Sequence, residues 1–196
     1  MTGTLGNFDV VAIGASAGGL KALMEVLSRL PADLPASVLV VQHLDPRHRS
    51  LLVELLQRRS KIRIQEAEND EPIERSVVYI APPDRHLLLT DGRMYLASTA
   101  FVHFSRPSID LLFESVAASV DSRAIGVILT GSGTDGTTGI KAIKEQGGTT
   151  IAQDPDTAEH NSMPHSAVAT GMVDFILPLA DIAPAIITLI TKGDKE

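Results

Sequence analysis

The chain has 196 residues, of which 44% are hydrophobic, and it carries a formal net charge of −7. This length and composition are typical of one globular domain with a substantial core, so we treat residues 1–196 as a single domain. The acidic balance argues against uniform nucleic-acid binding, and the absence of cysteine excludes disulfides and thiolate chemistry.

The first part of the sequence alternates between buried strands and amphipathic helices. Phe8–Ile13 and Ser37–His43 are apolar runs that predict strands, and Gly18–Leu30 predicts a helix whose apolar face begins at Leu20. A second helix is predicted over Arg49–Arg59. This alternation calls for a parallel sheet covered by helices.

Residues 61–97 change period and predict several short strands, with a hairpin turn at Asp91-Gly92. We expect this segment to be an antiparallel insertion or sheet edge. The remaining sequence returns to alternating elements. The predicted strands are 124–130, 149–153 and 173–178, and the predicted helices are 108–120, a segment through 142–147, and 180–190. The fold class is therefore α/β, a doubly wound, mostly parallel, Rossmann-like sheet with a short antiparallel β segment.

The ends of the sequence do not predict a targeting or membrane segment. The first apolar run has no basic region before it, and the apolar tract near the end is interrupted by Pro178, Asp181 and Pro184. We therefore expect a soluble cytoplasmic protein without membrane insertion.

Three polar residues follow three predicted strands. Ser16 follows the first strand, His43 ends the second, and Asp135 lies in the glycine-rich loop after the strand at 124–130. Active sites of doubly wound sheets lie at the carboxyl ends of the strands. A serine, a histidine and an aspartate that meet there have the chemistry of a nucleophile, a base and an orienting acid.

The surroundings of Ser16 suit a nucleophile. Ala15, Ala17, Gly18 and Gly19 are small, so a sharp turn can expose the hydroxyl. The free amides of the loop over residues 15–19 can stabilise a developing oxyanion, and the loop over residues 131–133 offers further backbone donors.

Each signal taken alone has another interpretation. The Gly-x-Ser-x-Gly loop also suits a phosphate-binding turn, although a dinucleotide site needs an acidic residue where the second strand ends in His43. His43 alone suits a core or rim position, and Asp135 alone suits a helix cap. The order Ser, His, Asp also differs from the Ser, Asp, His order of α/β-hydrolases.

Other polar residues give weaker signals. His86 is interpreted as structural or rim-forming, and Arg106 either contacts substrate or forms an ion pair. His160 and His165 lack the fixed spacing of metal ligands, so we expect no metal. A basic group is either a solvated helix face or a landing site for an acidic partner. Its members are Arg47, His48, Arg49, Arg58, Arg59, Lys61 and Arg63.

Seven segments in this order, GASAGG, VVQHL, IAPPDRHLLL, SRPSIDLLFESVA, GVILTGSGTDGTTG, IAQD and SMPHSAVATG, are similar to the catalytic domain of the chemotaxis protein-glutamate methylesterases (CheB). The resemblance covers roughly residues 8–190. It implies hydrolysis of glutamate γ-methyl esters on methyl-accepting chemoreceptors, with deamidation of some receptor glutamines, and no cofactor. It carries over a triad of Ser16, His43 and Asp135.

The sequence departs from the family at several positions. Ala17 replaces a usual threonine, Ser132 replaces a usual methionine, and SMP replaces the more usual GMP. Ala17, Gly18 and Ser132 are expected in oxyanion or substrate binding through their backbones. The family normally carries a receiver domain before the esterase domain, so we expect a separate or fused receiver or methyltransferase domain as a partner. The alternative is a nucleotide-binding or receptor-docking module without hydrolytic activity.

Overall fold

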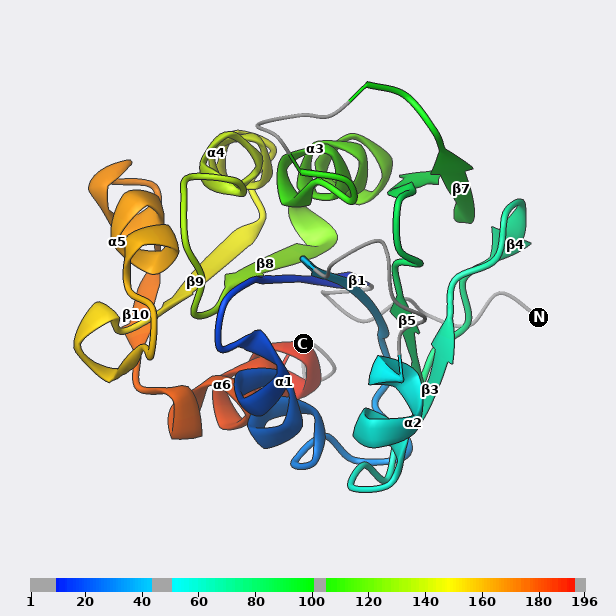
Figure 1. The fold of residues 1–196 in the computed structure, drawn as a ribbon, viewed down its shortest axis with the longest axis horizontal. Helices are drawn as coiled ribbons and strands as arrows, with labels where there is room; N and C mark the ends of the chain where they lie inside the picture. The colour runs from blue at the N-terminus through cyan, green and yellow to red at the C-terminus, as the bar shows by residue number, and fades with distance from the viewer. Residues whose placement is uncertain (1–9, 44–50, 101–104, 193–196) are drawn as a thin grey trace.

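The computed structural model describes residues 10–43, 51–100 and 105–192, and these build a sheet between two layers of helices (Figure 1). The strands of the main sheet are β1 (Val10–Ala15), β2 (Ser37–Gln42), β3 (Arg63–Glu66), β5 (Val77–Ile80), β8 (Ala124–Ile128), β9 (Thr149–Gln153) and β10 (Phe175–Leu177). Their order is β10-β9-β8-β1-β2-β5-β3, and every strand pair is parallel.

Helices cover both faces of this sheet (Figure 1). One layer contains α1 (Gly19–Leu27), α2 (Leu52–Gln57) and α6 (Leu179–Lys192), and the other contains α3 (Ile109–Val120), α4 (Thr137–Glu145) and α5 (Ser162–Ala169). Short 3-10 helices lie at Asp121–Arg123 and Pro155–Thr157. The predicted doubly wound fold is therefore confirmed.

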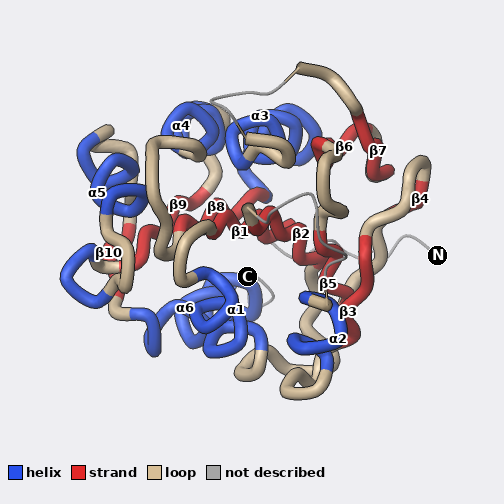
Figure 2. The backbone as a smooth tube through the Cα atoms, viewed as in Figure 1, coloured by secondary structure: helices blue, strands red, loops and turns tan. Residues whose placement is uncertain are grey.

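A second, smaller sheet lies beside α3 (Figure 2). It contains β4 (Glu71–Pro72), β6 (His86–Thr90) and β7 (Arg93–Ala97) in antiparallel pairs, with the predicted turn at Asp91-Gly92. The expectation that all of residues 61–97 form an antiparallel unit is wrong, because β3 and β5 join the main sheet in parallel. β3 is an edge strand with alternating burial, and this alternation resembles that of an antiparallel strand.

The central strand β1 joins two hydrophobic cores. Val11 and Ile13 pack into the cluster of α1 and α6, whereas Val10 and Ala12 pack into the cluster of α3 and α4. All four side chains are fully buried. This two-sided burial explains why the first strand is a continuous apolar run rather than an alternating one.

The strand order reverses at β1. From β1 the chain moves to β2 on one side, whereas β8, β9 and β10 follow each other on the other side. Crevices at such switch points, outside the carboxyl ends of the strands, are where ligands bind in open α/β sheets. Ser16 and Asp135 follow β1 and β8, the two strands at this point.

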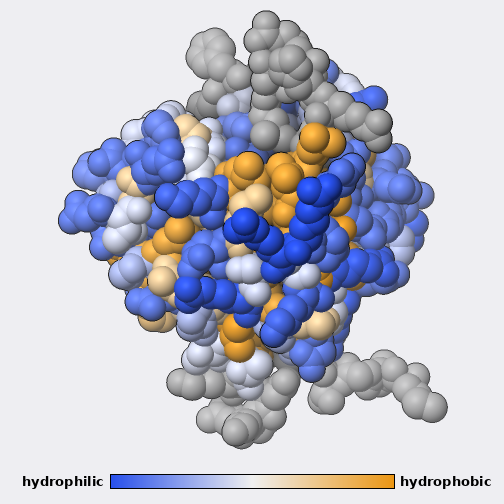
Figure 3. Space-filling model, turned by 60° about the horizontal axis from the view of Figure 1, so that its bottom comes forward, coloured by the Kyte–Doolittle hydropathy of each residue, from blue (hydrophilic) through white to orange (hydrophobic). Residues whose placement is uncertain are grey.

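Two apolar predictions for the helices need correction. Leu20, expected on the buried face of α1, is 38% exposed. Leu51, expected on the apolar face of the helix predicted over Arg49–Arg59, lies just before α2 and is 55% exposed. The face with α1, α2 and α6 comes forward in Figure 3, where hydrophobic residues gather between hydrophilic ones. Of the basic group, Arg58 and its neighbours Arg59, Lys61 and Arg63 are exposed, whereas residues 47–49 lie outside the described residues.

Candidate active site

Ser16 lies at the turn between β1 and α1, and its backbone is held by both neighbouring strands. Its amide donates to the carbonyl of Thr130, which follows β8, at 3.1 Å. Its carbonyl accepts from the amide of Gly19 at 2.9 Å and from Nε2 of Gln42, the last residue of β2, at 2.8 Å. Three segments therefore fix the position from which the Ser16 hydroxyl projects.

The turn after Ser16 requires glycine. Gly18 is the N-cap of α1 and has φ of 74°, in the left-handed region that other residues rarely adopt. A Cβ at Gly19 would lie 2.8 Å from Cδ of Gln42, so the helix start could not approach β2 as closely with a larger residue.

The turn also leaves amides available for an anion. Among the described residues, the amides of Ala17 and Gly18 have no acceptor, whereas the Ser16 amide donates to Thr130 and the Gly19 amide donates to Ser16. Free donors at the start of a helix favour bound negative charge.

Asp135 belongs to the loop between β8 and α4, and its carboxylate contacts the first residues of α3. Four donors converge on it there. Oδ2 accepts from the Ile109 amide at 2.8 Å and from Nε2 of His43 at 2.9 Å. Oδ1 accepts from the Asp110 amide at 2.9 Å and from the Ser108 hydroxyl at 3.1 Å. Burial raises the pKa of Asp135, but the hydrogen bonds from His43, Asp110 and Ile109 outweigh burial and leave it below the usual value. The carboxylate is therefore ionised at neutral pH.

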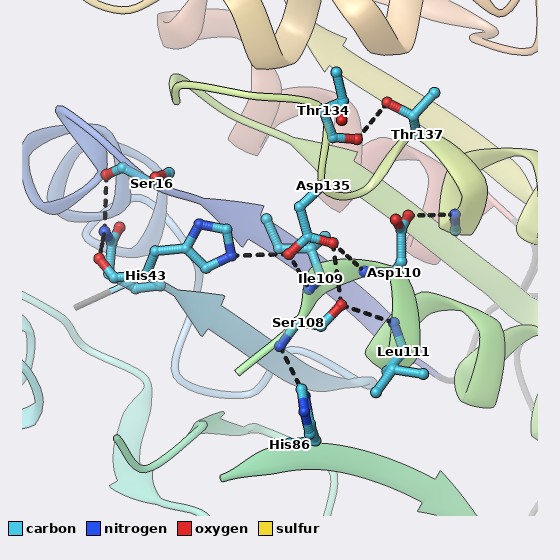
Figure 4. Close-up of polar contacts among 12 residues, drawn as sticks. Ser16, His43, His86, Ser108, Ile109, Asp110, Leu111, Thr134, Asp135 and Thr137 are labelled. Atoms are coloured by element: carbon cyan, nitrogen blue, oxygen red, sulfur yellow. Dashed lines mark hydrogen bonds and ion pairs between the residues drawn. The ribbon is translucent and has the colours of Figure 1, made fainter. Parts of the chain in front are cut away.

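His43 follows β2 and faces Asp135. Its side chain is 19% exposed, against 4% for Asp135. Because the ionised carboxylate only accepts, His43 must carry its proton on Nε2, which leaves Nδ1 as the ring acceptor. Figure 4 draws the ring between Ser16 and Asp135. Two of the three predicted residues, His43 and Asp135, are thus directly bonded.

The hydroxyl of Ser16 is not bonded to this pair. Within the described residues, no hydrogen bond joins Ser16 Oγ to His43 or to Asp135. Contacts of this kind are often long in the absence of substrate and tighten when it binds.

A hollow of about 410 Å³ opens beside Ser16. Leu20 and Met24 of α1 supply apolar walls, and Lys21 and Glu159 supply one charge of each sign. The loop after β8 closes against the same serine, since a Cβ at Gly131 would lie 2.9 Å from the Ser16 Cβ.

Ser132, expected to contribute a backbone donor, lies exposed in this loop. The amide of Gly131 donates to the His160 carbonyl at 2.9 Å, and that of Gly133 donates to the Ser162 hydroxyl at 3.0 Å. The Ser132 amide has no acceptor among the described residues. Of the amides of residues 131–133, that of Ser132 is therefore available to a ligand.

Several residues at the site were not identified from the sequence. Gln42 braces the Ser16 turn, and Ser108 binds Asp135. Gln42 could have been suspected from its place at the carboxyl end of a strand, whereas nothing in the local pattern of Ser108 points to Asp135. Arg106 forms the ion pair that was one of its two expected roles, with Asp84.

The described residues contain no group of three or more side chains suited to holding a metal ion. In the same part of the chain, no helix has the length and hydropathy needed to cross a membrane.

The structure is a parallel α/β sheet, and at its switch point a serine lies beside a histidine-aspartate pair. These are the side chains of a serine ester hydrolase with an α/β fold. The CheB methylesterase family matches residues 11–186, and the chain belongs to this family.

A solved structure supports the same family. The crystal structure of the Thermotoga maritima CheB methylesterase catalytic domain has a TM-score of 0.89 and 36% identity, over 93% of this chain and 99% of that one.

Curated relatives differ in length. The chain is 42% identical over 184 residues to a Leptospira interrogans protein with the provisional name protein-glutamate methylesterase/protein-glutamine glutaminase, and it spans 95% of that protein. It is also 42% identical to the protein-glutamate methylesterase/protein-glutamine glutaminase of Moorella thermoacetica, and 41% identical to that of Symbiobacterium thermophilum. It spans 45% and 51% of these two proteins, so it covers about half of their length.

Proposed function

We propose that this protein is a protein-glutamate methylesterase in which Ser16 is the nucleophile, His43 the general base and Asp135 the orienting acid. The observation that carries the proposal is the 2.9 Å hydrogen bond between His43 and Asp135 at the switch point that Ser16 borders. The names of the relatives, which join methylesterase and glutaminase activities, support the substrate.

The reaction begins with proton transfer from the Ser16 hydroxyl to Nδ1 of His43. The Ser16 oxygen attacks the carbonyl carbon of the γ-methyl ester and forms a tetrahedral intermediate. Asp135, already ionised, stabilises the imidazolium and holds the tautomer in which Nδ1 is the acceptor. The intermediate then expels methoxide, which leaves as methanol with the proton from His43.

The second half of the reaction releases the enzyme. Water gives a proton to His43 Nδ1, its oxygen attacks the acyl carbon, and the bond to Ser16 breaks as the serine regains its proton. The product is the glutamic acid side chain, which releases its proton to solvent and becomes the carboxylate. A glutamine side chain would react in the same way with ammonia as the leaving group, so glutamine deamidation is the second proposed activity.

The oxyanion of each intermediate is assigned to backbone amides. The candidates are Ala17, Gly18 and Ser132, whose amides lack an acceptor among the described residues. Since these donors belong to the backbone, the alanine at position 17 and the serine at position 132 do not remove them. Loss of one such donor typically costs about 100- to 1,000-fold in rate.

The proposed substrate is a helix of a methyl-accepting chemoreceptor. The hollow beside Ser16 is partly apolar, and its walls carry one charge of each sign, Lys21 and Glu159, so it offers both apolar and polar contacts to a helix. The exposed basic residues Arg58, Arg59 and Lys61 follow α2 and precede β3, at the amino ends of the parallel strands, so they are not assigned to this contact.

We further propose a single domain that acts in the cytoplasm, together with a separate or fused receiver or methyltransferase domain. This chain matches 45% of the length of the Moorella relative, so the homologous segment also occurs within a longer chain. Fractionation of cells that produce the full chain, and capture of partner domains on it, test these points.

The proposed function is tested with membranes that carry chemoreceptors labelled in their methyl groups. The expected result is release of methanol by the protein, and release of ammonia from receptors that carry glutamine at the same sites. Titration with nucleotides is run in parallel. Nucleotide binding without release of methanol or ammonia would overturn the proposal in favour of a binding module.

A further inference from the structure

A buried chain of hydrogen bonds connects the small antiparallel sheet to Asp135 (Figure 4). Its middle member is Ser108, the N-cap of α3, which is fully buried. The Ser108 hydroxyl accepts from the Leu111 amide at 3.4 Å and donates to Oδ1 of Asp135 at 3.1 Å. One hydroxyl therefore caps the helix and binds the carboxylate.

The outer member is His86, the first residue of β6, which is also fully buried. Its Nε2 lies 3.1 Å from the carbonyl oxygen of Ala100, which can only accept, so Nε2 carries the proton. Its Nδ1 then accepts from the Ser108 amide at 3.1 Å. Both ring nitrogens are used, and the pair of contacts fixes the neutral tautomer.

The hydrogen bond from the Ser108 amide to His86 fixes the backbone segment that binds the Asp135 carboxylate. The amides of Ile109 and Asp110, which both donate to Asp135, directly follow Ser108 in the chain. A displacement of Ser108 would therefore move three of the four donors to the carboxylate at once. The fourth donor is His43 itself.

We propose that His86 and Ser108 are positioning residues that set the orientation of His43 by fixing Asp135. The proposal rests on the proposed function for its kinetic consequence, because it assigns His43 as the base. Neither residue touches the reacting atoms: His86 acts through Ser108, and Ser108 acts through Asp135.

Two substitutions at His86 separate positioning from packing. In His86→Asn, the side-chain oxygen occupies the place of Nδ1 and still accepts from the Ser108 amide. In His86→Leu, the site stays filled but that amide loses its acceptor. The expected result is a fall in kcat of up to about 100-fold for His86→Leu, with unchanged KM, and substantial recovery in His86→Asn. A purely structural role would lower the folded fraction of both variants without this split in kcat per folded molecule.

A second readout does not depend on catalysis. The Nε2 proton of His43, bonded to a carboxylate, gives a downfield proton NMR signal in protein labelled with nitrogen-15. We expect this signal to persist in His86→Asn and to shift or broaden in His86→Leu. If His86→Leu does not fold, Ser108→Thr, which keeps the hydroxyl, and Ser108→Ala, which removes it, form the replacement pair with the same expected split.

Wild-type kcat and an unchanged His43 signal in both His86→Leu and Ser108→Ala would overturn the positioning role, even in an active esterase. If the wild-type protein releases no methanol, the proposed function fails, and the NMR comparison alone then decides the positioning role. Loss of the signal in His86→Leu with retention in His86→Asn would support it, and equal signals would overturn it.

Discussion

Replacement of Asp135 by asparagine tests the electrostatic design of the site, because four donors face a group that would then have only one acceptor oxygen. The NH2 group of the asparagine side chain can face either His43 and Ile109, or Ser108 and Asp110. The second orientation costs less, since the Ser108 hydroxyl can rotate to accept and only the Asp110 amide loses its partner. One buried unsatisfied donor costs about 1–3 kcal/mol, so we expect a loss of about 2 kcal/mol in the free energy of unfolding.

The same orientation predicts the kinetic effect of Asp135→Asn. The asparagine oxygen still accepts from Nε2 of His43, so the tautomer survives and only the charge beside the imidazolium is lost. We therefore expect kcat to fall on the order of 100- to 1,000-fold, as for the loss of one electrostatic stabiliser. A wrong tautomer would cost on the order of 10,000-fold.

Methanol release and urea unfolding, each at neutral and acidic pH, measure these effects of Asp135→Asn. The pKa of Asp135 is lowered in the native state, so its contribution to stability is full above its unfolded value of about 4. That contribution disappears as the pH falls through the native pKa. Asp154→Asn is the matched control, because that carboxylate caps a 3-10 helix after β9, a role that asparagine also fills. A kcat for Asp135→Asn within about threefold of the control would refute the reasoning.

Three further predictions concern other parts of the molecule. Gly131→Ala places a Cβ 2.9 Å from that of Ser16 and 2.5 Å from Sδ of Met163, so we expect kcat to fall up to about 100-fold in the methanol assay; an unchanged kcat would contradict the close packing of this loop. Asp174→Asn removes a carboxylate near the first residues of β9, at the end of the strand away from Ser16. Partial burial raises the pKa of Asp174, but hydrogen bonds from Lys144 and Thr150 lower it below the usual value. We expect urea unfolding to show a loss of about 1 kcal/mol above about pH 4, which disappears as the pH falls through the lowered native pKa, with kcat unchanged. Phe113→Ala empties a fully buried position between α3 and β8 and should cost about 3–5 kcal/mol in thermal or urea unfolding; a loss below about 1 kcal/mol would show that the core collapses around it.

The regular elements with two buried faces could be predicted from the sequence. β1 and β2 are uninterrupted apolar runs, and α3 begins one residue after the Ser108 position from which the helix was predicted. By contrast, α5 was not predicted from the sequence, and its eight residues include a proline. Pro164 lies in the first turn of that helix, where its missing amide hydrogen has no partner to lose.

The residues of the site likewise fall into those that could be predicted from the sequence and those that could not. Ser16, His43 and Asp135 could be proposed from the sequence because each follows a strand, and the carboxyl ends of parallel strands share one edge. The contact of Asp135 with Ser108, and of Ser108 with His86, could not be proposed. These contacts depend on how the small sheet packs against α3, which no local pattern specifies.

The nucleophilic role of Ser16 is the central claim, and methanol release from methylated receptors by Ser16→Ala tests it most directly. The matched control is Ser28→Ala, which removes a hydroxyl that donates only to the Glu25 carbonyl at the far end of α1. We predict that Ser16→Ala lowers the rate on the order of 10,000-fold or more, while Ser28→Ala retains the wild-type rate. A rate for folded Ser16→Ala within about tenfold of the control would contradict the account.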